Sequence, residues 1–222
     1  AEVVTVVRDA TDAPAPGAYS VCYVNAFQTQ PQERGGWLAE FPDLLLRDAD
    51  GNPVADPDWP DEYLLDTSSA DTREEIVRVV GETIATCAER GFDAVEFDNL
   101  DSFTRSGGAL SAGDNLALAT ELVGVAHGHG LAAAQKNAAE LTRRAREEAG
   151  FDFAVAEECV AFDECGAYTG VYGDAVLVVE YPDTLDVPFA EVCAAPDTPP
   201  TTLLRDRDLL ASDEPGHLRE AC

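Results

Sequence analysis

Carboxylate and lysine side chains follow directly on short strand-like segments of this 222-residue chain. Asp98 follows the segment 93–97, and Glu180 follows the apolar segment 175–179. A carboxylate beside a buried segment must be paired, protonated or functional, because an isolated buried charge is costly. Lys136, the only lysine in the chain, also follows such a segment. Acid–base chemistry, nucleophilic chemistry and cation binding are therefore the candidate functions. The rest of the sequence has to bring these side chains together.

Strand-like and helix-like segments alternate along the chain. The clearest helix, 71–91, has apolar residues at i, i+3, i+4 and i+7, and Asp71 with Glu74 resembles a capping box. Further helices are expected at 111–129, 138–149, 162–172 and 185–194. Strands are expected at 2–7, 20–25, 63–66, 93–97, 131–135, 151–156, 175–180 and 201–205.

Eight alternating units predict an α/β protein, a (β/α)8 TIM barrel forming a single domain over 1–222, because parallel strands need crossover helices. An open doubly wound sheet is the alternative. Against this alternative, the sequence lacks the usual nucleotide-binding signatures, since no G-x-G-x-x-G follows a strand and no G-x-x-x-x-G-K-[ST] occurs. The irregular segment 28–62 contains both tryptophans, Trp37 and Trp59, and its length is typical of a functional loop.

In a parallel barrel, the active site forms at the C-terminal ends of the strands. The polar residues at the predicted strand ends are Arg8, Asp9, Tyr23, Asn25, Asp66, Glu96, Asp98, Asn99, Asp101, Lys136, Asn137, Glu157, Glu158, Glu180, Tyr181, Arg205 and Asp206. The histidines lie outside these ends, which disfavours a Ser-His-Asp triad and a histidine-based metal site. Neither a metal nor a cofactor is predicted.

The chain has 43 Asp and Glu against 14 Lys and Arg, which gives a formal net charge of −29. This charge disfavours nucleic-acid binding, because phosphate recognition depends on Lys and Arg. Two explanations stay open: an acidic surface adapted to salt, and a cationic substrate. No run of about 18 apolar residues occurs, so no membrane span is predicted, and we expect a monomer.

The six cysteines are an even number without a C-x-x-C pair, which favours disulfides in an oxidising compartment over a zinc site. An oxidising compartment implies a secreted protein, and because the N-terminus does not have the pattern of a signal peptide, we expect that this peptide has been removed. Cys22 and Cys87 could form a disulfide, or Cys87 could be a buried thiol. The two favoured pairs are Cys159 with Cys165 and Cys193 with Cys222.

Six segments carry a family signature: VCYVN at 21–25, GFDAVEFDNLD at 91–101, QKN at 135–137, DFAVAEEC at 152–159, DEC at 163–165 and VEY at 179–181. In combination they resemble the secreted endo-α-1,4-polygalactosaminidases of glycoside hydrolase family 114. The resemblance implies a (β/α)8 barrel that hydrolyses polymers of α-1,4-linked galactosamine or N-acetylgalactosamine. It places the catalytic pair at Asp98 and Glu157, whereas the segment 26–30 departs from the family pattern.

Glycoside hydrolysis needs one carboxyl group to protonate the leaving oxygen and a second to act as nucleophile or base. Asp98 lies in a polar segment that suits an ionised nucleophile. Glu157 lies beside Glu158 and after an apolar strand, and both features should raise its pKa, as a general acid requires. With Asp98 as nucleophile and Glu157 as acid/base, we expect a retaining mechanism. The candidate sugar-binding residues are Asp9, Tyr23, Asn25, Asp66, Glu96, Asn99, Asp101, Lys136, Asn137, Glu180, Tyr181 and Arg205.

Two other functions stay open at this point. A lone lysine at a strand end could form a Schiff base, which would make the protein a lyase or an aldolase acting through Lys136. Surrounding carboxylates would favour the charged ammonium and oppose that role. A carbohydrate-binding barrel without catalytic activity is the other alternative, and its partner would again be a polysaccharide.

Overall fold

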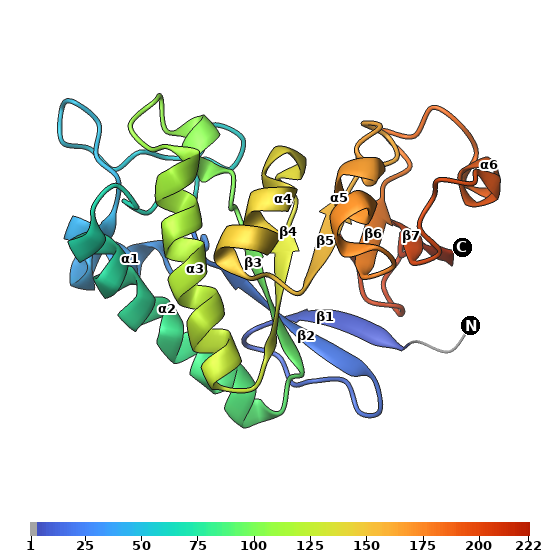
Figure 1. The fold of residues 1–222 in the computed structure, drawn as a ribbon, viewed down its shortest axis with the longest axis horizontal. Coiled ribbons are helices and arrows are strands. Elements are labelled where there is room, and N and C mark those ends of the chain that lie inside the picture. The colour runs from blue at the N-terminus through green and yellow to red at the C-terminus, as the bar shows by residue number, and fades with distance from the viewer. Residues whose placement is uncertain (1–3) are drawn as a thin grey trace. The chain divides into compact units, whose positions relative to one another are not determined.

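The computed structural model describes residues 4–222, and Figure 1 shows how their strands and helices alternate. These residues belong to two compact units, the second of which runs from Asp152 to Cys222. The start of the predicted strand 2–7 lies outside the described residues. Within the described part of the chain, no helix is long and apolar enough to cross a membrane.

Four parallel strands make the sheet of the first unit, in the order β1 (Thr5–Asp9), β2 (Tyr19–Asn25), β3 (Ala94–Asp98) and β4 (Ala132–Lys136). The register pairs Asn25 with Asp98 across β2 and β3. Polar residues at the C-terminal ends of neighbouring strands are therefore neighbours in space, as the sequence predicts.

Helix α2 (Ala70–Arg90) follows the apolar periodicity that predicted it, and it buries Ile76, Val80, Ile84 and Cys87. Ser69 caps the helix by accepting a hydrogen bond from the backbone N–H of Thr72, so the predicted cap by Asp71 and Glu74 is wrong. Gly91, at a φ of 90°, ends the helix because its left-handed conformation suits glycine. A disulfide between Cys22 and Cys87 ties β2 to this helix.

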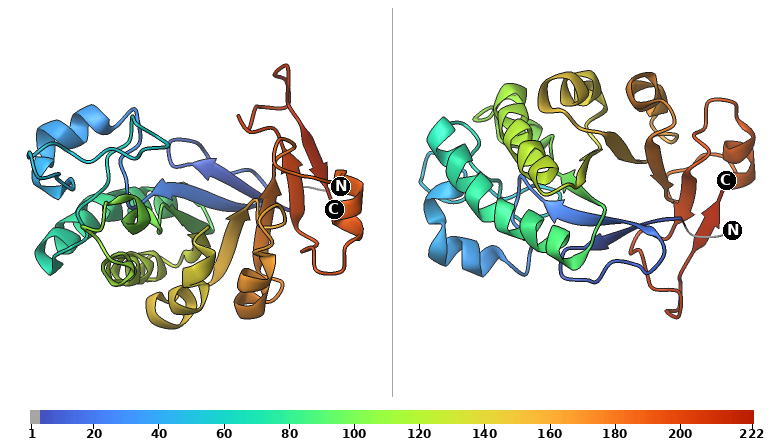
Figure 2. Two further views of the ribbon diagram at one scale, coloured as in Figure 1. Left: turned by 90° about the horizontal axis from the view of Figure 1, so that it is seen from above. Right: turned by 60° about the horizontal axis from the view of Figure 1, so that its bottom comes forward.

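Helix α3 (Ala112–Gly128) lies beside α2, and both cover the same sheet (Figures 1 and 2). Its N-terminus has a complete capping box of Ser111 and Asp114. The continuous helix predicted at 138–149 is instead a series of short turns. They are η3 (Ala139–Leu141), α4 (Thr142–Arg144) and the π-helical turn η4 (Ala145–Ala149).

The long segment between β2 and α2 contains α1 (Arg34–Glu40) and η1 (Pro42–Leu44), which the sequence did not predict. A strand was predicted at 63–66, and this prediction is wrong, because these residues form only isolated antiparallel bridges within the same segment. The apolar pair that suggested a strand has a local role: Leu64 packs with Leu46 and Leu110 in a small hydrophobic cluster. A further short turn, η2 (Ser102–Arg105), follows β3.

The second unit contains three parallel strands, β5 (Phe153–Glu157), β6 (Val176–Glu180) and β7 (Thr202–Arg205). Helix α5 (Cys165–Tyr172) connects β5 to β6, and α6 (Phe189–Ala194) connects β6 to β7. A last strand, β8 (Arg219–Ala221), pairs antiparallel with β7. Disulfides Cys159–Cys165 and Cys193–Cys222, the two pairs favoured by the sequence, lie in this unit.

The predicted alternation of strands and crossover helices is therefore confirmed within each unit. Seven of the eight predicted strands correspond to β1–β7, with small shifts in their ends. The eighth strand differs from the prediction in place and direction, because it comes from the C-terminus and runs antiparallel. The arrangement is that of an α/β fold with mostly parallel strands.

Candidate active site

Asp98, the last residue of β3, is held by donors from three different segments. The Tyr23 hydroxyl donates a hydrogen bond of 2.7 Å to Oδ2, and the backbone N–H of Asn99 donates one of 2.8 Å to Oδ1. The ammonium of Lys136 lies 3.7 Å from Oδ2. The Asp98 side chain is 19% exposed, so substrate can still reach it. A carboxylate fixed in this way, and still accessible, can act as a nucleophile.

Lys136, the last residue of β4, lies between two carboxylates of β3. Its Nζ is 3.6 Å from Oε1 of Glu96 and 3.7 Å from Oδ2 of Asp98. It also lies over the ring of Tyr23, 6.0 Å from the centroid. Opposite charges on two sides stabilise the ammonium, which is the form without a nucleophilic lone pair. This geometry disfavours Schiff-base chemistry and suits a lysine that binds carboxylate or hydroxyl oxygens.

The hydroxyl of Tyr23 stays protonated in this environment. Burial raises the pKa of Tyr23 far above its ordinary value, and the neighbouring charges of Asp98 and Glu96 raise it further. Tyr23 therefore acts as a hydrogen-bond donor to Asp98 over the whole working range of an enzyme.

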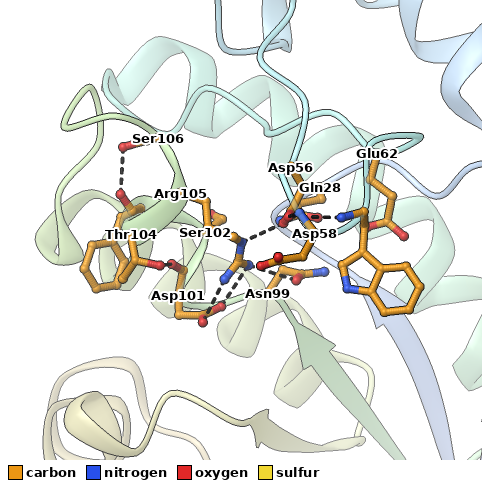
Figure 3. Close-up of polar contacts among 12 residues, drawn as sticks. Gln28, Asp56, Asp58, Glu62, Asn99, Asp101, Ser102, Thr104, Arg105 and Ser106 are labelled. Carbon is orange, nitrogen blue, oxygen red and sulfur yellow. Dashed lines mark hydrogen bonds and ion pairs between the residues drawn. The ribbon is translucent and has the colours of Figure 1, made fainter. Parts of the chain in front are cut away.

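A second polar network lies beside Asp98, and Figure 3 draws the part of it around Arg105. The Asn99 amide donates to Oδ1 of Asn25 at 2.9 Å, and the Asn25 amide donates to Oε2 of Glu62 at 3.0 Å. Arg105 donates to Asn99 at 3.1 Å and to both carboxylate oxygens of Asp101. The network therefore joins the strand ends of β2 and β3 to the long loop that precedes α2.

Asp56 anchors that loop on the same arginine. Its Oδ2 lies 2.6 Å from Nε of Arg105 and accepts a hydrogen bond of 2.6 Å from Gln28. Its Oδ1 accepts the backbone N–H groups of Asp58 and Trp59. Burial raises the pKa of Asp56, but these hydrogen bonds and the Arg105 charge outweigh it and lower the pKa. Asp56 is thus a charged residue that fixes the loop to Arg105 and holds the turn at Asp58 and Trp59.

Glu157, the last residue of β5, accepts a hydrogen bond of 2.5 Å from the hydroxyl of Tyr181. The next residue, Glu158, turns to Arg207, whose Nη2 lies 2.8 Å from Oε1. Arg207 in turn stacks over the ring of Tyr181 at 4.3 Å and so braces the partner of Glu157. The neighbouring charge of Glu158, which was expected to act on Glu157, is therefore balanced by an arginine.

Three residues after strand ends adopt left-handed backbone conformations that are uncommon for side chains other than glycine. They follow β3, β4 and β5 directly: Asn99 has a φ of 65°, Asn137 of 50° and Glu158 of 60°. Asparagine tolerates this region better than other residues, whereas glutamate is strained in it. Such strain concentrates at functional sites, and here it lies next to Asp98, Lys136 and Glu157.

Several predicted site residues are engaged with the protein itself. Glu180 is fully buried and accepts the backbone N–H groups of Val160 and Ala161 at 2.8 and 3.3 Å. Burial raises the pKa of Glu180 despite these hydrogen bonds. Arg205 donates to the carbonyls of Leu218 and Leu210, so it holds the C-terminal loop.

Two more predicted residues lie at the ends of other segments. Asp9 accepts hydrogen bonds from the N–H and hydroxyl of Thr11 and from Gln30; although burial raises its pKa, these bonds together lower it. Asp66 accepts the N–H of Ser68, just before α2. Neither has a hydrogen bond or ion pair to the Asp98 network among the described residues.

Sequence reasoning did not identify Glu62, Asp56, Arg105 or Arg207. Arg105 had a usable signal, because it lies four residues after Asp101 and can pair with it across one helical turn. The two acidic residues had none, since the loop that contains them is rich in carboxylates and its path depends on tertiary contacts.

The chain resembles known proteins over its whole length. A family model described as glycoside-hydrolase family GH114 matches residues 1–222. No curated protein matches the chain. Among solved structures, Aspergillus fumigatus Ega3 in complex with galactosamine is 23% identical, with a TM-score of 0.71 over 93% of this chain and 79% of that one. The glycoside hydrolase domain of PelA from Pseudomonas aeruginosa is 15% identical, with a TM-score of 0.63 over 93% of this chain and 88% of that one. At these identities the two structures show a shared fold.

Proposed function

The chain belongs to glycoside-hydrolase family GH114 and is a glycoside hydrolase, and on that premise we propose that it cleaves a polysaccharide of α-1,4-linked galactosamine and N-acetylgalactosamine. The observation that carries this proposal is the environment of Asp98. Its carboxylate is oriented by Tyr23 and Asn99, is paired with Lys136, and is still reachable by substrate. The galactosamine bound to the similar Ega3 structure supports the choice of sugar.

We assign the nucleophile to Asp98 and the acid/base to Glu157. In the first step, Glu157 gives its proton to the glycosidic oxygen while Asp98 attacks the anomeric carbon and the leaving chain departs. In the second step, Glu157 takes a proton from water, which attacks the same carbon and releases Asp98. Tyr181 holds the carboxyl group of Glu157 by its 2.5 Å hydrogen bond and so limits its rotation. Two displacements at one carbon give retention of configuration.

The surrounding residues divide into substrate contacts and scaffold. We propose that Tyr23, Asn25, Glu96, Asn99, Lys136, Asn137 and Tyr181 face the sugar. Asp101 is held by Arg105, and Glu180 and Arg205 are held by backbone groups, so we assign these three to positioning the strand-end loops. The assignment of Asp101, Glu180 and Arg205 follows from the ion pair and the backbone hydrogen bonds that hold each of them within its own unit.

The proposal includes a complete (β/α)8 barrel and secretion. The parallel strands with crossover helices, and the similarity to two glycoside hydrolase structures, support the barrel. The disulfides Cys22–Cys87, Cys159–Cys165 and Cys193–Cys222 support an oxidising compartment, because disulfides rarely persist in the cytosol.

The test is incubation of the purified protein with partly deacetylated α-1,4-galactosaminogalactan, with mass spectrometry of released oligosaccharides. We expect a ladder of oligosaccharides, and NMR during the reaction should show that the α-anomer forms first. An initial β-anomer would replace the retaining mechanism by an inverting one. Binding to the polymer without any cleavage would instead favour the non-catalytic carbohydrate-binding barrel.

The Schiff-base alternative has its own readout. Borohydride traps an imine between Lys136 and a carbonyl substrate as a stable adduct, which mass spectrometry locates on the peptide. We expect no adduct, because two carboxylates hold the Lys136 side chain as an ammonium.

A further inference from the structure

Glu62 differs from the other carboxylates in the network beside Asp98. Asp56 and Asp101 pair with Arg105 at 2.6 and 2.9 Å, and Asp98 lies 3.7 Å from Lys136. Glu62 has a hydrogen bond from Asn25, but among the described residues no Lys, Arg or His nitrogen lies within ion-pair distance of it. It is a half-buried carboxylate without an ion-pair partner among the described residues, and the charge of Arg105 acts on it only from beyond ion-pair distance.

The position of Glu62 is fixed relative to Asp98. Oδ1 of Asn25 accepts from Asn99 and from the backbone N–H of Gln28, which leaves its amide directed at Glu62. Asn99 follows Asp98 directly in the chain. The Glu62 carboxylate is therefore two side-chain amides away from the proposed nucleophile. Figure 3 labels Glu62 and Asn99 in one view, without the Asn25 that links them.

The electrostatic environment of Glu62 favours a cation. Burial raises the pKa of Glu62, and the charges of Asp98 and Asp56 raise it further; the Asn25 hydrogen bond and the Arg105 charge lower it but do not outweigh these effects. A positive group placed beside Glu62 would relieve the repulsion among these carboxylates.

The loop that carries Glu62 also presents an aromatic surface. The backbone N–H of Glu62 donates to the carbonyl of Trp59 at 2.8 Å, and Trp59 is 65% exposed. Asp56 fixes this turn, because its carboxylate accepts a hydrogen bond from the backbone N–H of Trp59. A flat apolar ring and a carboxylate on one braced turn are suited to a sugar that carries an amine.

We propose that Glu62 selects galactosamine units over N-acetylgalactosamine units by binding the sugar ammonium beside Asp98, with Trp59 offering a stacking surface on the same turn. This inference rests on the proposed function and adds its specificity. Acetylation removes the positive charge, so an N-acetyl unit forgoes the charge-assisted contact and also places a larger group there.

The experiment compares Glu62→Gln with the wild-type protein on a deacetylated and a fully N-acetylated polymer of equal length. We expect the KM for the deacetylated polymer to rise about tenfold with little change in kcat, because a charge-assisted hydrogen bond is lost in ground state and transition state alike. The N-acetylated polymer, measured as substrate or as competitive inhibitor, should change its KM or Ki by less than about threefold. The matched control is Asp61→Asn, since Asp61 is exposed and paired with Arg34 outside the network.

Three results would overturn the inference. Equal losses on both polymers would mean that Glu62 supports the site without reading the amine, and no loss on either would mean that it does not touch substrate. A fall in kcat at constant KM would place Glu62 in the chemistry instead. Failure of the proposed function is distinguishable, because then the wild-type protein itself neither cleaves nor binds either polymer.

Discussion

Asp98 and Glu180 are each the last residue of a parallel strand, yet they do different things. Asp98 ends β3 and meets a tyrosine hydroxyl, a backbone N–H and a lysine, with part of its side chain open to solvent. Glu180 ends β6, is fully buried, and binds the backbone of the loop after β5. Asp98 is partly exposed, so substrate can reach it, whereas Glu180 has no exposed surface. A strand-end carboxylate is therefore a candidate by position, and its partners decide its role.

Glu157 extends this comparison to a third strand end. It ends β5 and has a hydroxyl donor, Tyr181, as Asp98 has Tyr23. In both cases one carboxylate oxygen is held by a phenol, which fixes orientation without cancelling the charge. This shared feature groups Glu157 with Asp98 and separates both from Glu180.

The sharpest test of the comparison applies one change, acid to amide, at the two contrasting positions. Asp98→Asn should lower polymer cleavage by about 10⁴-fold, because an amide cannot form the covalent intermediate. Glu180→Gln should lower it by less than about tenfold, because its partners are backbone groups. Initial rates on the partly deacetylated polymer measure both, with circular dichroism to confirm the fold. Equal losses in two folded variants would remove the distinction.

Glu157→Gln should have the second-largest effect, a loss of about 10²- to 10⁴-fold, because general acid catalysis is removed. The loss should be much smaller on a substrate whose leaving group needs no proton, such as an aryl glycoside with a low leaving-group pKa. Tyr181→Phe is the matched control for orientation and should cost about tenfold, the effect of one hydrogen bond. A loss that is independent of the leaving group would argue against Glu157 as the acid.

The sequence predicted this contrast only in part. It identified Asp98, Glu157 and Glu180 because each comes at the end of a short apolar segment that predicts a strand. The same apolar segments predicted the positions of β1–β7. It could not tell Glu180 from the others, since the donors of Glu180 are backbone N–H groups at Val160 and Ala161, which every residue type has.

Tertiary contacts explain the elements that the sequence did not predict. The strand predicted at 63–66 has the right apolar pattern, but Leu64 packs in a local cluster with Leu46 and Leu110. β8 was not predicted because it is short and exposed, and pairing with β7 is what makes it a strand. The role of Arg105 depends on the path of a loop that reaches it from Asp56, a separation that no local pattern encodes.

The scaffold role of Glu180 should appear in stability. Glu180→Gln should reduce the free energy of unfolding by about 1 to 3 kcal/mol, because the amide oxygen can accept from one backbone N–H while the amide nitrogen offers a donor to the other. Chemical denaturation measures this loss. The control is Glu121→Gln on the exposed surface of α3, where we expect a change within about 0.5 kcal/mol.

The stability that Glu180 contributes should fall as pH rises. Burial raises the pKa of Glu180 above its ordinary 4.5, so the folded protein keeps this proton over a pH range in which the unfolded chain has lost it. The contribution of Glu180 to stability is then complete below pH 4.5 and declines as pH rises through the folded pKa. The gap between wild type and Glu180→Gln should therefore narrow from acidic to neutral pH, and a gap that widens would contradict the raised pKa.

The smallest expected effect separates the strand-end carboxylates from the acidic surface. Raising the salt concentration from about 0.02 to 0.5 M shortens the screening length to a few ångströms, which weakens long-range attraction between the −29 chain and a cationic polymer. We expect the KM for deacetylated polymer to rise about threefold. The contacts of Asp98 are short and partly buried, so salt should leave kcat nearly unchanged. An N-acetylated polymer is the control, because it carries no charge for the surface to attract. If its KM rose as much, the salt effect would belong to the protein's own conformation, and the surface carboxylates would have no part in collecting substrate.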